Sequence, residues 1–446
     1  MLFKKDRAAA RPQNSFRVIS LGFLVLVLTG ALILMLPISS QARCVTPFPD
    51  ALFTAISASC VTGLIVRDTA TYWSLFGQAV ILLLIQIGGM GVITMGLTVA
   101  KLSGKKIGLR FRGMMQDSIS APQVGGILRL TKFILKMTAA IELTGAALLY
   151  PVFCRDFGAV RGAWYALFHA VSAFCNAGFD LMGVREPFSS LTSYGGHIYV
   201  NIVVMLLIVL GGIGFLTWDD FVQHRHHFRK YRLQTKLVLM SSALLILLPA
   251  VFFFFAEYAG APAKERVLYS LFQSVTARTA GFNTADLSQM SEPGALLMTV
   301  LMLTGGSSGS TAGGMKVTTF SVLLLAALSV FQRKTDVEAF GRRIPADIVR
   351  TAGAILFMYT SLFLTTGIAV SMIESMPLIP CLFETGSALG TAGVTLGITT
   401  SLSLPSHIIL MLLMFAGRVG GLTLIYAAFS SGADASRLPQ EKLTVG

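Results

Sequence analysis

Long apolar runs separated by short polar segments dominate the pattern of the chain. They cover residues 18–36, 75–99, 133–153, 198–216, 237–256 and 355–373. Each is close to the ~20 residues that an α-helix needs to cross a hydrocarbon core about 30 Å thick. Only helices and closed barrels satisfy their backbone in lipid, and a barrel would show alternating segments of about ten residues instead. The pattern therefore predicts membrane-spanning helices. The first run ends at Pro37 without a small-residue cleavage pattern, so we expect a retained helix rather than a signal peptide.

A shorter pattern recurs between the long runs. Four eight-residue segments share Leu-Phe at their second and third positions, at 51–58, 166–173, 270–277 and 381–388. Each is soon followed by three uncharged residues ending in glycine, namely Val61-Thr62-Gly63, Asn176-Ala177-Gly178, Thr279-Ala280-Gly281 and Thr391-Ala392-Gly393. These glycines recur about every 110 residues, as expected for an internal repeat. We call the four triplets the filter loops.

The repeat predicts the architecture. The units cover approximately residues 16–100, 130–222, 236–331 and 350–430 of a single transmembrane domain, 1–446. Each contains a long apolar helix, a short amphipathic helix, a glycine-ended loop and a second long apolar helix. The short helices cannot span a bilayer, so we expect re-entrant loops that line a water-filled cavity. The predicted fold is an all-α integral membrane protein of about eight transmembrane helices and four re-entrant pore loops, with pseudo-four-fold symmetry around one pore.

Glycines also recur within or near the end of the second helices, at 88–91, 211–214, 305–306 and 417–420. They are compatible with close helix packing alone.

Composition and charge agree with this architecture. The chain is 54% hydrophobic and only 13% charged, about half the charged share of a soluble domain. Its net charge of +14 is concentrated in four segments, within 4–17, 101–136, 225–236 and 333–350. Basic segments between membrane spans lie on the cytoplasmic side, so both termini are predicted to be cytoplasmic and all four loops to enter from outside. Because orientation explains these charges, nucleic-acid binding is disfavoured.

Other kinds of site are poorly supported. The five cysteines form no C-x-x-C pair, and His224, His226 and His227 lie in a basic segment, so we expect no metal site. The glycine-rich stretch before Lys316 lacks the Gly-Lys-Ser/Thr of a phosphate-binding loop, and no strand precedes it. An intramembrane enzyme would need a catalytic pair. His169 and Glu384 occupy equivalent places in two pore segments, but no nucleophile motif accompanies them.

The filter loops carry no charged side chain, so a ligand among them would be met by backbone carbonyl oxygens. Four strands of carbonyls that converge on one axis can replace the hydration shell of K⁺. Glycine tolerates positive φ and lets a loop aim carbonyls inward without a β-carbon clash. The preceding short helices end at the loops, where the negative ends of their dipoles favour a cation. We therefore predict a K⁺ selectivity filter at these twelve residues, with no cofactor in this chain.

Two segments resemble a known family. The stretch Arg278-Thr-Ala-Gly-Phe-Asn283 and the run 305–316 are similar to the most distinctive segments of the Trk/Ktr/HKT potassium transporter superfamily, and the resemblance covers essentially the whole chain. Because about fifteen residues precede the first repeat helix, we expect the shorter Ktr type. The resemblance implies a potassium-uptake subunit in the bacterial inner membrane, a homodimer bound to a cytosolic ring of nucleotide-binding regulatory subunits. All four filter positions are Gly, whereas a Ser in the first loop would have indicated sodium.

The run 305–316, here called the polar run, interrupts the second helix of the third unit. By the resemblance it is an intramembrane gate below the filter, formed by Gly305, Gly306, Ser307, Ser308, Gly309, Ser310, Thr311, Ala312, Gly313, Gly314 and Lys316, together with Arg418. Twelve mostly Gly, Ser and Thr residues cannot face lipid, so they line or plug a cavity unless they form an ordinary extramembrane loop. Arg418 lies inside an apolar span, where a charge faces the bundle interior or water. It either opposes cation passage, pairs with Glu142, or snorkels.

Two alternative functions stay open, and so does the role of seven acidic residues. A sodium-preferring or weakly selective cation channel of the same fold fits most of the pattern. A secondary transporter with broken helices would show inverted repeats, whereas these run in the same direction. Seven acidic residues on the predicted outer side either concentrate cations at the mouth or are simply solvated. They are Asp50, Asp68, Asp180, Glu186, Asp286, Glu292 and Glu384.

Overall fold

The computed structural model describes residues 13–91, 94–95, 113, 116 and 126–420, which are mostly helical. Four of the described helices are long and apolar enough to cross a membrane. They are α1 (Gln13–Met35), α6 (Ile127–Phe157), α10 (Leu233–Phe252), which continues as the π-helix η5 (Phe253–Glu257), and α14 (Ala346–Glu374). Each coincides with a predicted apolar run. Only 22% to 33% of the residues in their apolar windows are buried, so most of their surface is free to face lipid.

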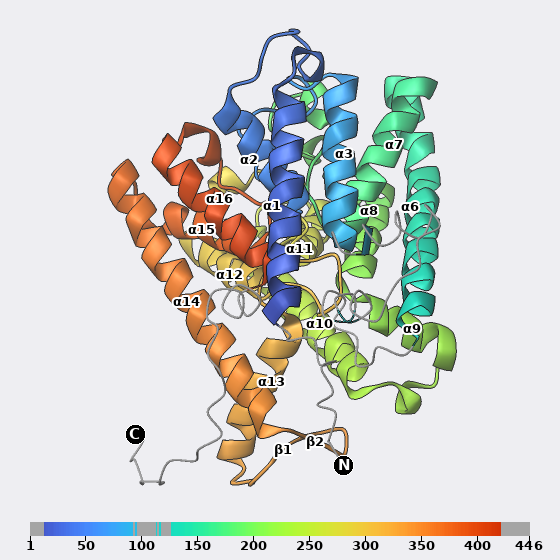
Figure 1. Ribbon diagram of the computed structural model, residues 1–446, viewed down its shortest axis with the longest axis vertical. Coiled ribbons are helices and arrows are strands. Elements are labelled where there is room, and N and C mark those ends of the chain that lie inside the picture. The colour runs from blue at the N-terminus through green and yellow to red at the C-terminus, as the bar shows by residue number, and fades with distance from the viewer. Residues whose placement is uncertain (1–12, 92–93, 96–112, 114–115, 117–125, 421–446) are drawn as a thin grey trace, which may run out of the picture.

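Four short helices form the interior between these spans. They are α2 (Phe48–Ser59), α7 (Ala159–Phe174), α11 (Ala263–Thr276) and α15 (Leu378–Gly390), and their C-terminal halves are buried. Pro47, Pro262 and Pro377 stand directly before three of them. Proline lacks the N–H that a helix start leaves unpaired, so it favours initiation there. The predicted short helices are confirmed, and Figure 1 shows them between α6 and α14, which lie at opposite sides of the molecule.

The second helices are shorter than predicted. They are α3 (Leu75–Met90), α8 (Ile198–Gly212), α12 (Glu292–Leu303) and α16 (Leu404–Val419). Continuous helices over 75–99 and 198–216 are therefore a wrong prediction; residues 96–99 lie outside the described part. Gly91, Gly214 and Gly420 follow α3, α8 and α16 with φ of 87°, 92° and 89°, values that an α-helix cannot contain.

The continuations of two of these helices are described. After Gly214 the chain turns by 95° into α9 (Phe215–His224). After the polar run it resumes as α13 (Val317–Phe331). The predicted interruption of the third unit's second helix is thus confirmed.

The glycines of the second helices also allow close packing. A β-carbon at Gly88, Gly211 or Gly417 would collide with the carbonyl oxygen of Ser59, Phe174 or Leu389, respectively. Each of those carbonyls lies at the end of a short helix, so the glycines bring the second helices against the helices that lead to the filter loops.

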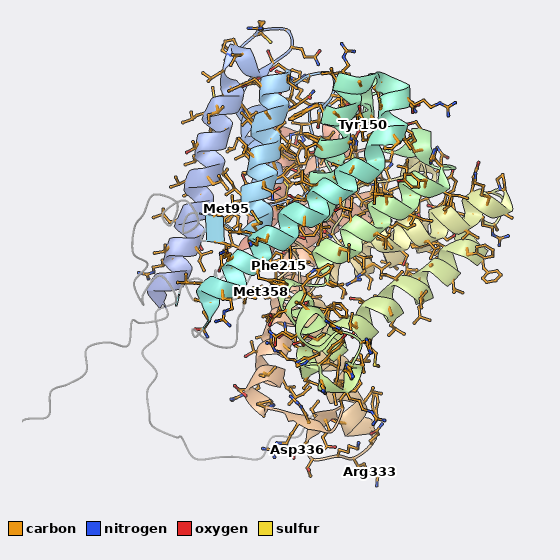
Figure 2. All side chains as sticks on the ribbon, turned by 90° about the vertical axis from the view of Figure 1, so that its right-hand side faces the viewer. Met95, Tyr150, Phe215, Arg333, Asp336 and Met358 are labelled. Atoms are coloured by element: carbon orange, nitrogen blue, oxygen red, sulfur yellow. The ribbon has the colours of Figure 1, made fainter. Side chains whose placement is uncertain are left out.

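A small hairpin departs from the all-α prediction. Strands β1 (Val337–Ala339) and β2 (Arg342–Ile344) pair antiparallel through a two-residue turn. Phe340 and Gly341 in the turn have φ of 50° and 70°, which is the pattern of a type I′ hairpin turn. The Phe340 ring lies 6.2 Å from that of Phe228, so two of the predicted basic segments are side by side. Figure 2 shows Arg333 and Asp336 in this region, at the end of the molecule opposite Tyr150.

The other two basic segments are described only in part, since residues 1–12 and most of 101–125 lie outside the described residues. Short helical turns complete the list of elements: η1 (Pro37–Ser39), η2 (Met182–Val184), η3 (Thr192–Tyr194), η4 (Phe228–Lys230), η6 (Leu287–Gln289) and η7 (Thr399–Ser401).

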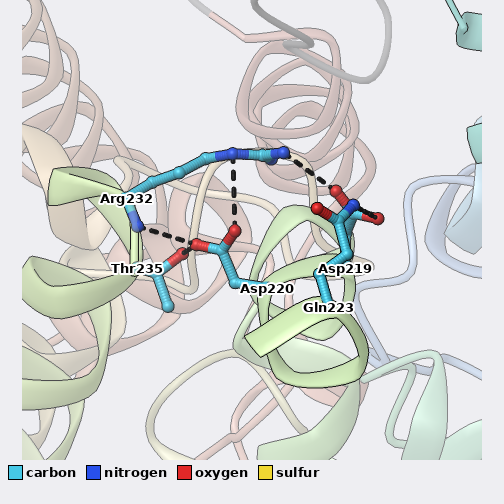
Figure 3. Close-up of polar contacts among 5 residues, drawn as sticks. All are labelled: Asp219, Asp220, Gln223, Arg232 and Thr235. Atoms are coloured by element: carbon cyan, nitrogen blue, oxygen red, sulfur yellow. Dashed lines mark hydrogen bonds and ion pairs between the residues drawn. The ribbon is translucent and has the colours of Figure 1, made fainter. Parts of the chain in front are cut away.

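A buried carboxylate fixes α9 to α10 (Figure 3). The Asp220 side chain is fully buried; it accepts a hydrogen bond from the Arg232 backbone N–H at 3.0 Å and from the Thr235 hydroxyl at 2.6 Å. The Arg232 guanidinium also lies 3.4 Å from Asp220 and 2.9 Å from Asp219. Gln223 donates to Asp219 at 2.6 Å. Because a buried carboxylate must be satisfied, this cluster sets how the chain returns after the bend at Gly214.

Candidate ion pathway

The four filter loops share one backbone geometry. The first residue of each has a positive φ: Val61 56°, Asn176 58°, Thr279 68° and Thr391 51°. The glycine of each does too: Gly63 98°, Gly178 68°, Gly281 85° and Gly393 77°. Three of the first residues are β-branched, for which this region is a genuine outlier. Such strain costs about 1–3 kcal/mol per residue and is concentrated at functional sites. The sequence does not reveal this strain.

The four glycines contact one another's loops in cyclic order. A β-carbon at Gly63 would lie 2.6 Å from the carbonyl oxygen of Ala177, and one at Gly178 would lie 2.9 Å from that of Ala280. A β-carbon at Gly281 would lie 3.1 Å from the carbonyl oxygen of Ala392. The cycle closes with Gly393, whose β-carbon would collide with the Thr62 carbonyl. We call Gly63, Gly178, Gly281 and Gly393 the glycine ring.

This arrangement brings all twelve predicted filter residues together at one place. The carbonyl oxygen of each loop's middle residue lies beside the glycine of the preceding loop, where no side chain can intervene. All twelve residues are buried. Four uncharged backbone segments that meet through their carbonyl oxygens are suited to a partly dehydrated monovalent cation.

The polar run lies against the C-terminal ends of the broken helices. Ser307 N–H donates to the Gly212 carbonyl at 2.9 Å, and Gly314 N–H donates to the Gly417 carbonyl at 3.2 Å. Phe215 N–H, after the bend, donates to the Gly309 carbonyl at 2.8 Å. Helix C-termini leave carbonyls without an intrahelical partner. The run satisfies such carbonyls inside the bundle, and most of its residues are buried, so it is not an ordinary exposed loop.

Arg418 connects the polar run to the first unit. Its guanidinium donates to the Thr311 carbonyl of the run and to the carbonyls of Gly88 and, at 2.9 Å, Gly89 at the end of α3. Three carbonyls thus surround this charge. The alternative that Arg418 pairs with Glu142 is wrong, because Glu142 instead accepts hydrogen bonds from Gln86 and Cys175. Lys316 turns back onto its own run and donates to the Ala312 carbonyl at 2.7 Å.

The polar run also touches the filter loops. The Thr311 hydroxyl donates to the Phe174 carbonyl at 3.0 Å and lies 3.3 Å from the Asn176 side-chain amide. A β-carbon at Gly313 would collide with the Thr391 hydroxyl. The run and the filter loops are therefore in direct contact, with no layer of side chains between them.

Comparison with known proteins identifies the family. A model of the TrkH family of cation transport proteins matches residues 2–437. The chain belongs to this family. The potassium/sodium uptake protein NtpJ of Enterococcus hirae is 38% identical to it over 100% of both chains, and Ktr system potassium uptake protein B of Bacillus subtilis is 37% identical over 96% of each. The resemblance inferred from the sequence is therefore confirmed.

The fold of this TrkH-family membrane protein is shared with a solved structure. The potassium transporter TrkH from Vibrio parahaemolyticus superposes with a TM-score of 0.73 and 18% identity, covering 95% of this chain and 86% of that one.

Sequence analysis of this family member missed a set of supporting hydroxyls. The seventh position of each eight-residue segment is Ser or Thr, one turn before the filter loop. Gly63 N–H donates to the Ser57 hydroxyl at 3.1 Å, the Ser172 hydroxyl donates to the Phe179 carbonyl at 2.7 Å, and Thr276 bonds to Phe282 in the same way. The signal was present in the aligned segments, because the residue at this position carries a hydroxyl group in all four.

His169 and Glu384 each bond within their own unit. The Leu181 N–H donates to His169 Nε2 at 3.3 Å, so Nδ1 carries the proton and donates to the Tyr165 carbonyl at 2.7 Å. Glu384 accepts hydrogen bonds from Thr395 and Thr399. Both side chains hold the segment that follows a filter loop. No contact joins them to each other in the described part of the chain, which counts against a catalytic pair.

Several of the acidic residues that are predicted to lie on the outer side have structural partners as well. Asp50 pairs with Arg67 at 2.8 Å, and Asp68 accepts from the Thr71 N–H at 2.8 Å. Asp286 accepts from Ser288 N–H at the start of η6. These bonds favour local loop structure as the role of these three carboxylates over attraction of cations.

Proposed function

We propose that this chain is the ion-conducting membrane subunit of a potassium uptake system, in which K⁺ passes through the glycine ring and the polar run acts as the gate. The cyclic contact of the four filter loops carries this proposal. It supports a single pore with pseudo-four-fold symmetry, built from units at approximately 16–100, 130–222, 236–331 and 350–430 of one domain. Parts of the first and last units lie outside the described residues.

Gating follows from the position of the polar run. The run contacts the filter loops and is held there by hydrogen bonds to carbonyls of α8 and α16 and to Arg418. A cation leaving the filter inward would meet this segment and a fixed positive charge. Electrostatic repulsion in a medium of low dielectric constant is strong, so displacement of the run together with Arg418 would open the path.

The partners and location are part of the same proposal. Relatives are named as members of a Ktr system, which supports a separate regulatory subunit. We expect a homodimer bound to a cytosolic nucleotide-binding ring, in the bacterial inner membrane, with both termini cytoplasmic. The chain itself would need no cofactor, only the transported ion, and would bind no nucleic acid. The neighbouring basic segments around Phe228 and Phe340 form a surface that fits a cytosolic side.

A sodium-preferring or weakly selective channel is the second candidate. The name of the Enterococcus hirae relative, a potassium/sodium uptake protein, favours keeping it. The two candidates differ in selectivity and not in fold.

Rubidium uptake into proteoliposomes that contain the purified chain tests both. We expect uptake that K⁺ inhibits at lower concentration than Na⁺. Equal inhibition by the two ions would favour the second candidate, and an absence of ion-selective uptake would contradict both.

A further inference from the structure

A buried carboxyl of α6 has no part in the function proposed above. Glu142 is 6% exposed and lies in the middle of a helix that is apolar enough to cross the membrane. It accepts a hydrogen bond from Gln86 of α3 at 3.2 Å and one from the Cys175 thiol at 3.7 Å. No Lys or Arg pairs with it among the residues that the structure describes. Because a carboxyl within a membrane is costly, such residues are retained mainly for function.

Cys175 connects this carboxyl to the second filter loop. It is fully buried, follows the last residue of α7, and is joined directly to Asn176. A β-carbon at Gly89 would lie 2.8 Å from its sulfur, so the thiol fits between the end of α3 and Glu142. A shift of the carboxyl would therefore act on Cys175, the residue directly before the filter loop.

The same place supports the polar run. The carbonyls of Gly88 and Gly89 accept hydrogen bonds from Arg418, which also holds Thr311. The Thr311 hydroxyl donates to Phe174, the residue before Cys175. The cluster of Glu142, Gln86 and Cys175 thus adjoins both the start of the second filter loop and Phe174, to which the run is bonded.

The corresponding positions in the other units are supported differently. The residue before each filter loop is Cys60, Cys175, Arg278 or Gly390. The Arg278 guanidinium donates to the Ser242 hydroxyl at 2.9 Å, and a β-carbon at Gly390 would collide with the Met302 carbonyl. Among these four described positions, a carboxyl supports only the second. Its role is therefore specific to that loop.

We infer that Glu142 is a positioning residue for the second filter loop, acting through Cys175, and that it helps to set selectivity for K⁺. This inference rests on the proposed function. The carboxyl does not touch the ion; it holds the thiol, and the thiol holds the start of the loop. A small shift there changes the distance of the Asn176 and Ala177 carbonyls from the axis, which affects K⁺ binding more than the maximal rate.

The test compares Glu142→Leu with Glu142→Gln in the full chain, using rubidium uptake into proteoliposomes. Leucine removes both hydrogen bonds and should raise KM for K⁺ about tenfold and weaken discrimination against Na⁺, with a smaller change in maximal rate. Glutamine can still accept from the thiol through its amide oxygen and should stay near wild type. Thr144→Val is the matched control, because Thr144 is exposed on the same helix and, among the described residues, bonds only to the Ala140 carbonyl.

A double-mutant cycle with Cys175→Ala tests whether the thiol transmits the effect. We expect Glu142→Leu to add little in the Cys175→Ala background, whereas independent roles would give additive changes and overturn the inference. Wild-type KM and selectivity in Glu142→Leu would overturn it too. Should that variant not fold, Cys175→Ala alone decides, since a wild-type KM there contradicts the inference. Failure of the proposed function looks different, because the wild-type protein itself would then show no K⁺-selective uptake.

Discussion

The filter loops are repeated in all four units, whereas the polar run that contacts them comes from one unit. At the filter, every unit contributes three uncharged residues with positive φ at the first and third, and each glycine contacts the next loop in turn. Next to the filter loops, the third unit alone contributes a run of this kind among the residues that the structure describes. The second helices of the first, second and fourth units end at glycines, and the run bonds to them directly or through Arg418.

The difference matches what the proposed function requires of each part. A ring of carbonyls around one cation works only if four backbones have matched geometry, so the local pattern is repeated. A movable barrier needs a single segment whose attachment can be released without disturbing the other three. Four repeated filter loops and one unrepeated polar run can thus separate ion binding from its control in one chain.

The largest effect is expected from breaking the glycine ring. We expect Gly63→Ser, Gly178→Ser, Gly281→Ser and Gly393→Ser each to lower apparent K⁺ affinity by at least about tenfold, or about 1.4 kcal/mol, and to reduce discrimination against Na⁺. The added β-carbon meets a carbonyl of the neighbouring loop, most severely at Gly393. Uptake of K⁺ in competition with Na⁺ measures both quantities.

Gly353→Ser is the control for this series. Gly353 lies in α14, has no positive φ, and would have nothing within 4 Å of a β-carbon. It should behave as wild type. Wild-type affinity and selectivity in all four ring variants would remove the basis for a filter at these residues.

Removing the barrier should have the next largest effect. Deletion of residues 309–313 takes away the segment that meets the filter loops from below, so flux should rise and depend less on a cytosolic partner. Rubidium uptake with and without that partner measures the change. Discrimination between K⁺ and Na⁺ should fall less than in the glycine-ring variants, because the deletion removes contacts to the filter loops but retains the four glycines. Unchanged flux in a correctly folded deletion would show that the run is not a gate.

Arg418→Ala should raise flux less than the deletion does. It removes a fixed positive charge and three hydrogen bonds to carbonyls but leaves the run in place. Arg418→Lys is the informative comparison, since a lysine keeps the charge but cannot reach three carbonyls with one planar group. If the positive charge limits flux, Arg418→Lys should have wild-type flux. If the three hydrogen bonds to carbonyls matter more, its flux should match that of Arg418→Ala. If neither folded variant alters flux, Arg418 has only a structural role.

The smallest effect is expected at the hydroxyls that support the filter loops. Ser172→Ala removes the 2.7 Å bond to the Phe179 carbonyl and should cost about 1 kcal/mol, measured as a several-fold rise in KM for K⁺. Ser387→Ala is its matched control, because the buried Ser387 hydroxyl has no hydrogen-bond partner in the described part of the chain. Equal effects of the two substitutions would contradict a supporting role for Ser172.

The amino-acid sequence by itself determined the long spans, the short helices and the location of the filter loops. These features depend on local patterns, because apolar length, a recurring Leu-Phe segment and an uncharged glycine triplet are each contained in a few neighbouring residues. The sequence also located the polar run and its interruption of the third unit's second helix. It did not show at which residues the second helices of the other units end, since an apolar run continues beyond the residue where the backbone leaves the helix.

Only the tertiary structure decided which atoms meet. The partners of Arg418 are backbone carbonyls from the third and first units. Every residue has such a carbonyl, so a sequence pattern cannot show which ones are used. Glu142 was visible as a charge in an apolar span, but its link to Cys175 joins residues 33 positions apart on different helices. The cyclic order of the glycine ring likewise depends on how four helix pairs pack. Local periodicity specifies elements, whereas contacts between elements depend on the packing of the whole chain.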